Sequence, residues 1–205
     1  MELKKAIENR VSVRSFLPDK INAGELREMV RLAAMAPSVN NYQPWKFIAV
    51  INSGTLREMA ELVSQKIALL PGNNTQVSGN VRSQVEWFST FFREAPVLIA
   101  LTMEAYETVL EKGVNLPHDE INRSRNYPDM QSAGACIQNL LLAATDMGYG
   151  ACWLSAPLIA RDELEVILGI KAPYRLISFV AVGKPRHMPQ PKNKKDIEEI
   201  FELKE

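Results

Sequence analysis

The chain has 205 residues, of which 46% are hydrophobic and 23% charged, as is ordinary for a globular protein with one sizeable domain. Lysine and arginine number 24, as do aspartate and glutamate, so the balance does not favour a general nucleic-acid or membrane-surface binder. No window is apolar over the length of a membrane span, and the first residues lack a signal-peptide run, so we expect a cytoplasmic protein without a membrane partner.

The cysteines and histidines suggest no metal site and no disulfide framework. Cys136 and Cys152 lie in apolar surroundings, which favours a reducing compartment. His118 and His187 are far apart and have no cysteine nearby. We expect both histidines in loops.

The N-terminal stretch predicts a short helix and then an extended segment. Leu3 and Ile7 share one face of a helix that ends near Arg10. If the next residues are extended, their alternation puts Arg10, Ser12 and Arg14 on one side. Two guanidinium groups flanking a hydroxyl can cradle a phosphate. Two solvated arginines on a sheet edge remain the alternative.

A second helix is predicted from Asn22, with Glu25 as the partner in a capping box, and Pro37 stops it. The segment that follows, 36–45 (APSVNNYQPW), carries no charge and several neutral donors and acceptors. Such a set suits a flat, polar-edged heterocycle. An asparagine-rich turn capped by a core tryptophan explains the same residues and stays open.

Periodicity places the remaining elements. Apolar runs predict strands at 47–51, 97–102, just after Gly150, and 176–182. Amphipathic or apolar patterns predict helices that begin at Thr55 (with Glu58 completing a capping box) and cover 81–93, 131–147 and 161–169. Polar and proline-containing stretches predict a loop at 71–80 and a long irregular, lid-like section at 113–129.

Two segments point to a second subunit. Helix 131–147 is apolar on nearly all sides, and a subunit interface could bury it. The tail, 184–205, is too irregular to pack alone and too apolar to float freely, which indicates an arm on a partner. The aromatic residues of 81–93 fit a pocket wall, but at this spacing they are more often core or interface residues. Without repeats or linkers, we expect one domain over 1–205, built from alternating strands and helices.

Four motifs occur in order along the chain: R-x-S-x-R, A-P-S-x-x-N-x-Q-P-W-x-F, G-x-G-x-x-W and V-G-x-P. Together they resemble the nitroreductase family, from about residue 7 to residue 197. The resemblance implies an α+β fold with three α/β/α layers and a central mixed sheet flanked by helices. It also implies an intertwined homodimer that binds FMN at its interface.

The resemblance also implies site residues, all of them contacts to FMN. Arg10, Ser12 and Arg14 match the N-terminal contacts, the first and third of which meet the phosphate and ribityl ends. Val11 stands where the family often has a polar residue, so that side-chain contact is lost. A contact to the pyrimidine edge from about 65–80 has no clear match. Pro37, Ser38 and Asn41 match the segment that lies along the flavin ring, usually from the opposite subunit. Gly150 and Ala151 match the main-chain segment beside the ring. Lys192 and Lys194 match a C-terminal phosphate contact that is usually arginine.

The implied function is an FMN-dependent oxidoreductase that passes electrons from NAD(P)H to nitroaromatics, quinones or similar small acceptors by a ping-pong mechanism. Flavin N5 would carry the chemistry, so no catalytic side chain is expected, and Arg14 is the cation expected nearest N1. We expect Cys152 only to pack. The alternatives are a divergent family chemistry (dehalogenation or flavin destruction), which would depend on a lid at 113–130, and a non-catalytic flavin-binding protein.

Overall fold

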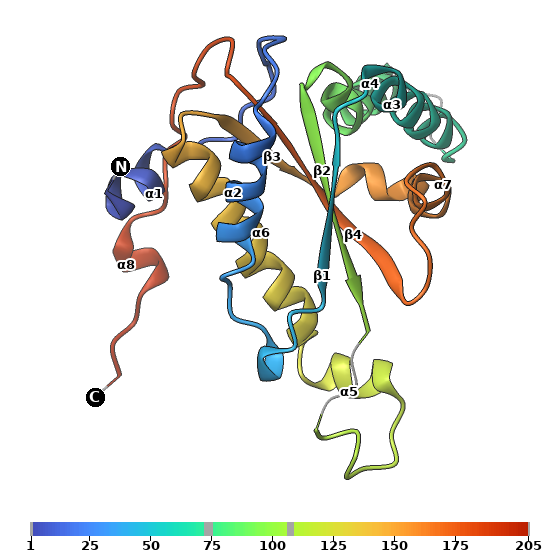
Figure 1. The fold of residues 1–205 in the computed structure, drawn as a ribbon, viewed down its shortest axis with the longest axis vertical. Coiled ribbons are helices and arrows are strands. Elements are labelled where there is room, and N and C mark those ends of the chain that lie inside the picture. The colour runs from blue at the N-terminus through green and yellow to red at the C-terminus, as the bar shows by residue number, and fades with distance from the viewer. Residues whose placement is uncertain (1, 72–75, 106–108, 205) are drawn as a thin grey trace.

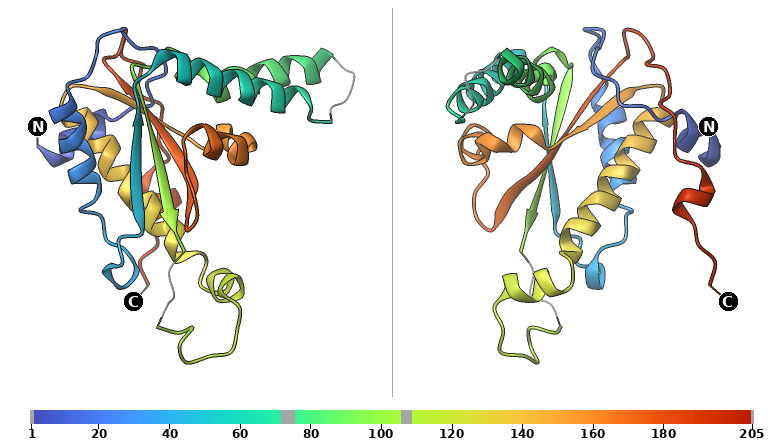
Figure 2. Two further views of the ribbon diagram at one scale, coloured as in Figure 1. Left: turned by 45° about the vertical axis from the view of Figure 1, so that its right-hand side comes forward. Right: turned by 180° about the vertical axis from the view of Figure 1, so that it is seen from behind.

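In the computed structural model, which describes residues 2–71, 76–105 and 109–204, one sheet separates two layers of helices (Figures 1 and 2). Its strand order is β1-β2-β4-β3, and each neighbouring pair is antiparallel. The strands are β1 (Trp45–Val50), β2 (Val97–Glu104), β3 (Gly150–Leu154) and β4 (Tyr174–Gly183). The expected α+β, three-layer arrangement is confirmed. Within the described residues, the mixed character of the sheet comes only from an isolated parallel bridge between Ser12 and Ala151.

The helices form one layer on each face of the sheet (Figure 2). One layer holds α1 (Leu3–Asn9), α2 (Ala23–Ala33) and α6 (Pro128–Asp146). The other holds α3 (Ser53–Ala68), α4 (Gln76–Thr90) and α7 (Arg161–Ile167), together with short 3₁₀ turns η2 (Phe91–Glu94) and η3 (Ala156–Ala160). Turn η1 (Val39–Asn41) follows α2, α5 (His118–Ser124) lies beyond the end of the sheet, and α8 (Ile197–Ile200) lies in the tail (Figure 1).

A separate apolar core fills each side of the sheet. In β2, Leu98 and Ala100 face the core under α3, whereas Ile99 and Leu101 face the core under α6. Successive side chains of a strand point to opposite faces, so a strand covered on both sides must be apolar throughout. This explains why a continuous apolar run marked β2 correctly.

Two helix starts differ from the predicted capping boxes. Asn22 does cap α2, and its Oδ1 accepts a hydrogen bond from Gly24 N–H at 2.7 Å. Glu25, however, accepts from the hydroxyl of Tyr149 at 2.8 Å. The predicted cap at Thr55 is wrong: Asn52 caps α3, and its side chain accepts from the Thr55 N–H at 3.0 Å.

Two predicted loops contain helices. Residues 76–80 form the first turn of α4, so the predicted loop at 71–80 is wrong there, while 72–75 lie outside the described residues. The irregular section at 113–129 contains α5, whose first residue is His118, and α6 begins at Pro128. His118 is therefore helical, and its ring Nδ1 lies 3.0 Å from a carboxylate oxygen of Glu111.

Helix α6 is covered largely by its own chain, because α1, α2 and β3 pack around it. Other apolar side chains stay exposed in this layer and in the tail. Leu3 and Met35 are exposed, as are Ile200 and Phe201, whose side chains are 65% and 63% exposed. Figure 1 shows the tail passing beyond α1 and running away from the body. No helix of the described residues has the length and apolar character needed to cross a membrane.

Candidate functional site

The segment after α1 runs beside the edge strand β3. Val13 is buried, and its N–H donates to the carbonyl of Ala151 at 3.0 Å. Because side chains alternate in an extended segment, Arg10, Ser12 and Arg14 lie on the opposite side of the segment from the Val13 side chain, and all three are half-buried. The extended conformation that the alternation predicted is present around the Ser12 bridge.

A hollow of about 510 Å³ opens over this segment. Arg10, Ser12 and Arg14 line one part of it, and residues 189–192 and Lys194 of the tail line another. Its four cations come from both ends of the chain, with Glu8 as the acidic lining residue: Arg10, Arg14, Lys192 and Lys194. We call this the basic hollow. Five predicted site residues meet here although nearly 180 positions separate them in sequence.

Chain pairing brings the two ends of the chain together. The N–H of Leu17 donates to the carbonyl of Lys184 at 2.8 Å, and the N–H of Arg186 donates to the carbonyl of Ser15 at 3.0 Å. An isolated antiparallel bridge joins Phe16 to Pro185. The start of the tail is therefore held against the extended segment, which carries 189–194 over it.

Gly150 and Ala151 lie behind the extended segment. Both are buried, and an added Cβ on Gly150 would come within 2.7 Å of Val13. A side chain there would force the extended segment off the sheet edge. The structure therefore gives Gly150 a packing role that the sequence pattern did not reveal.

The Cys152 thiol lies next to the same segment but inside the core. Its side chain is 2% exposed and belongs to the core under α3. Burial raises the pKa of the Cys152 thiol, and the charge of Arg14 and the Ser12 hydroxyl oppose the shift only in part. A thiol that stays protonated is a poor nucleophile, which agrees with the expectation that it packs.

The predicted ring segment lies at the other end of the molecule. Pro37, Ser38 and Asn41 follow α2 and lie near the end of α6 that is remote from residues 10–14 (Figure 1). Asn41 is exposed, with a positive φ of 55°. Ser38 Oγ accepts from the N–H of Gln43 at 2.9 Å, and Gln43 also has a positive φ, of 54°. Within one chain these residues do not meet the basic hollow.

The sequence left the role of the aromatic residues in 81–93 undecided, and in the structure they lie in two different environments. Phe91 and Phe92 are core residues, whereas Trp87 and Phe88 are 52% and 40% exposed. The guanidinium of Arg14 lies 5.2 Å from the centroid of the Phe88 ring. Phe91 and Phe92 are buried because η2 packs against α3, and the spacing of the aromatic residues does not predict this contact.

A metal centre has no support in the described residues, where no three His, Cys, Asp or Glu side chains gather as ligands. A contact to the pyrimidine edge of a flavin from the 65–80 region cannot be assigned, since part of that region lies outside the described residues.

Comparisons with known proteins identify the family of the chain. The sequence model of the Nitroreductase family matches residues 7–184. Protein DrgA of Synechocystis is 30% identical over 195 residues, which cover 90% of this chain and 84% of DrgA. A BluB-like flavoprotein from Clostridium difficile 630 superimposes with a TM-score of 0.87 at 28% identity and full coverage of both chains. A nitroreductase with bound FMN from Bacteroides fragilis NCTC 9343 shares the fold, with a TM-score of 0.73 at 22% identity and full coverage of both chains.

Proposed function

Because the chain belongs to the nitroreductase family, we propose that it is an FMN-dependent oxidoreductase that passes electrons from NAD(P)H to a small acceptor such as a nitroaromatic or a quinone. The observation that carries this proposal is the basic hollow. The FMN held by the B. fragilis structure supports the same cofactor.

The residues of the basic hollow suit the phosphate end of FMN. Arginine pairs with phosphate through two parallel hydrogen bonds, and Arg10 and Arg14 both line the hollow. Lys192 and Lys194 add point charges from the tail, and Ser12 adds a hydroxyl. Four cations beside one carboxylate favour a ligand group with more than one negative charge.

Bound FMN would supply the hydride chemistry at its ring, and the protein would supply binding and orientation. Arg14 is held by the Phe88 ring at 5.2 Å and stands between the basic hollow and the exposed aromatics of α4. It is therefore suited to stabilise negative charge on a ligand. The Cys152 thiol remains protonated and inside the core, so it takes no covalent part.

We further propose that the working form is a homodimer. Leu3, Met35, Ile200 and Phe201 expose apolar side chains in one helix layer and in the tail, and such surface is typical of an interface. A two-fold partner would bring its Ser38–Asn41 segment, with its exposed neutral amides, to the basic hollow of this chain.

The test begins with purified protein. A flavin absorbance spectrum with close to one FMN per chain, and oxidation of NADH or NADPH that accelerates when a nitroaromatic or a quinone is added, would support the proposal. Initial rates at several acceptor concentrations should give parallel double-reciprocal lines. Flavin without any NAD(P)H oxidation would instead favour a non-catalytic flavin-binding protein, and release of halide from a halogenated aromatic would favour dehalogenation.

A further inference from the structure

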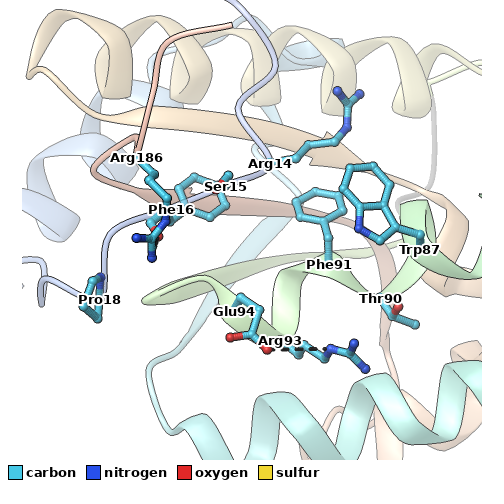
Figure 3. Close-up of a pocket in the computed structure, with 10 residues that line it drawn as sticks. All are labelled: Arg14, Ser15, Phe16, Pro18, Trp87, Thr90, Phe91, Arg93, Glu94 and Arg186. Carbon is cyan, nitrogen blue, oxygen red and sulfur yellow. Dashed lines mark hydrogen bonds and ion pairs between the residues drawn. The ribbon is translucent and has the colours of Figure 1, made fainter.

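A second hollow opens on the other side of Arg14, and the proposed cofactor chemistry does not use it. It has a volume of about 380 Å³ and lies where the end of α4 and η2 meet residues 14–18 and Arg186 (Figure 3). We call it the aromatic hollow. Small-molecule sites in proteins are typically about 300–1,000 Å³, so this hollow has room for one small ligand.

Trp87 forms one wall of the aromatic hollow, and its ring lies against a buried phenylalanine. The rings of Trp87 and Phe91 have centroids 6.0 Å apart and are inclined by 34°. Phe91 is buried in the core, and Trp87 is about half exposed. Figure 3 shows both rings on one side of the hollow, with Phe16 and Arg186 opposite them. A planar ring can stack on a tryptophan that is supported in this way.

The charges around the hollow select for an anion. Its lining includes three arginines, Arg14, Arg93 and Arg186, and one carboxylate, Glu94. Arg93 has a partner already, because its Nε lies 3.7 Å from a carboxylate oxygen of Glu94. A cationic ligand would meet repulsion from the other two.

Arg186 is the cation best placed to receive the anionic group. Its Nη2 donates to the carbonyl of Phe16 at 3.3 Å, and it forms no ion pair within the described part of the chain. Arg14 is likewise without a carboxylate partner among the described residues and contacts the Phe88 ring. The hollow therefore offers two groups to a ligand: arginines without acidic partners in the described chain for an anionic group, and the Trp87 ring for a planar ring.

We propose that the aromatic hollow binds a small planar aromatic anion, with its ring against Trp87 and its anionic group at Arg186. An aryl carboxylate and a purine nucleotide phosphate share this chemistry. Helix α4 belongs to the layer opposite α1, α2 and α6, whose exposed apolar residues we assign to the dimer (Figure 2).

The test uses FMN-loaded, full-length protein and isothermal titration calorimetry. Benzoate and AMP are the two probes, benzamide and inorganic phosphate are their controls, and the variants are Arg186→Gln and Trp87→Leu. Neither Arg186 nor Trp87 lines the basic hollow, so flavin content should stay unchanged. Trp87→Phe keeps an aromatic wall, and Arg57→Gln, an exposed arginine on α3, is the matched charge control.

We expect benzoate or AMP to bind at least about tenfold more tightly than its control, because a charged hydrogen bond and a stacking contact add together. Arg186→Gln and Trp87→Leu should each weaken binding about fivefold or more, while Trp87→Phe and Arg57→Gln should retain it. Binding of benzoate alone would identify an aryl carboxylate site, and binding of AMP alone a nucleotide site. The proposal fails if neither probe binds better than its control. It also fails if Arg186→Gln and Trp87→Leu bind the probe as tightly as the parent protein does.

Discussion

Gly150 lies so close to Val13 that a Cβ on the glycine would approach the Val13 Cβ to 2.7 Å. This contact allows the Val13 N–H to reach the Ala151 carbonyl and places the neighbouring arginines over the sheet edge. The glycine therefore controls the position of Arg10 and Arg14 without touching the ligand that we assign to them.

Gly150→Ala should displace the extended segment and weaken FMN binding. The added methyl meets core atoms that cannot move freely, and overpacking of this kind costs about 1–3 kcal/mol of stability. We expect a lower urea midpoint and a loss of flavin absorbance on dialysis. Gly79→Ala is the control, since nothing lies within 4 Å of a Cβ at Gly79. Full flavin retention in Gly150→Ala would show that the contact does not set the site.

Replacing both Arg10 and Arg14 with alanine should remove most of the FMN affinity. Each charged hydrogen bond to a phosphate contributes about 1.5–3 kcal/mol, so the double variant should bind at least about 100-fold more weakly. Flavin fluorescence titration of the apoprotein measures this directly. Arg57→Ala, on α3, should titrate like the parent protein. If the double variant matches the parent, the basic hollow is not the phosphate site.

The tail should contribute both to assembly and to cofactor binding, and two variants separate these roles. A chain that ends at Pro185 loses Lys192, Lys194 and the exposed Ile200 and Phe201, so it should be monomeric by light scattering and free of flavin. The full-length double variant Lys192→Gln/Lys194→Gln should remain a dimer, with an interface on the order of 2,000 Å² or more, and show weaker FMN binding. A flavin-loaded monomer from the shortened chain would contradict the proposed arrangement.

Cys152→Ser should leave turnover within about threefold of the parent, because a protonated thiol in the core takes no part in the chemistry. The rate of NAD(P)H oxidation per bound FMN is the measurement, so that any loss of cofactor is counted separately. A collapse of this rate with FMN still bound would assign a chemical role to Cys152.

The burial of Cys136 predicts how the free energy of unfolding changes with pH. Burial raises the pKa of the Cys136 thiol from 9.0 to about 12. Because the unfolded chain releases this proton at lower pH than the folded one, stability must fall as the pH rises above about 9. At pH 10 the loss is about 1.4 kcal/mol relative to neutral pH. Urea unfolding at pH 8 and pH 10 should show this loss in the parent and a smaller one in Cys136→Ala. An equal loss in both proteins would rule out Cys136 as its source.

The local pattern of the sequence was enough to predict the strands and one half of the basic hollow. Continuous apolar runs marked β2 and β4 because both faces of these strands are covered. The alternation of Arg10, Ser12 and Arg14 needed only the period of an extended chain. These features depend on residues that are close together in sequence.

The features that were missed depend on long-range packing or on weak local signals. The first turn of α4 contains Gly79 and polar residues, which resemble a loop, yet it continues a helix packed against α3. Arg186 reaches the aromatic hollow only because Phe16 pairs with Pro185, some 170 positions away. No spacing rule in the sequence joins those two segments.

Arg14 lines both the basic hollow and the aromatic hollow. Two ligands that share one side chain cannot bind independently if either changes how that side chain is held. Thermodynamic reciprocity then fixes the relation between them: whatever factor an aromatic anion imposes on the affinity for the cofactor, the cofactor imposes on the affinity for the anion. Through Arg14, binding of a ligand in one hollow would then be measured as a change in ligand affinity at the other hollow.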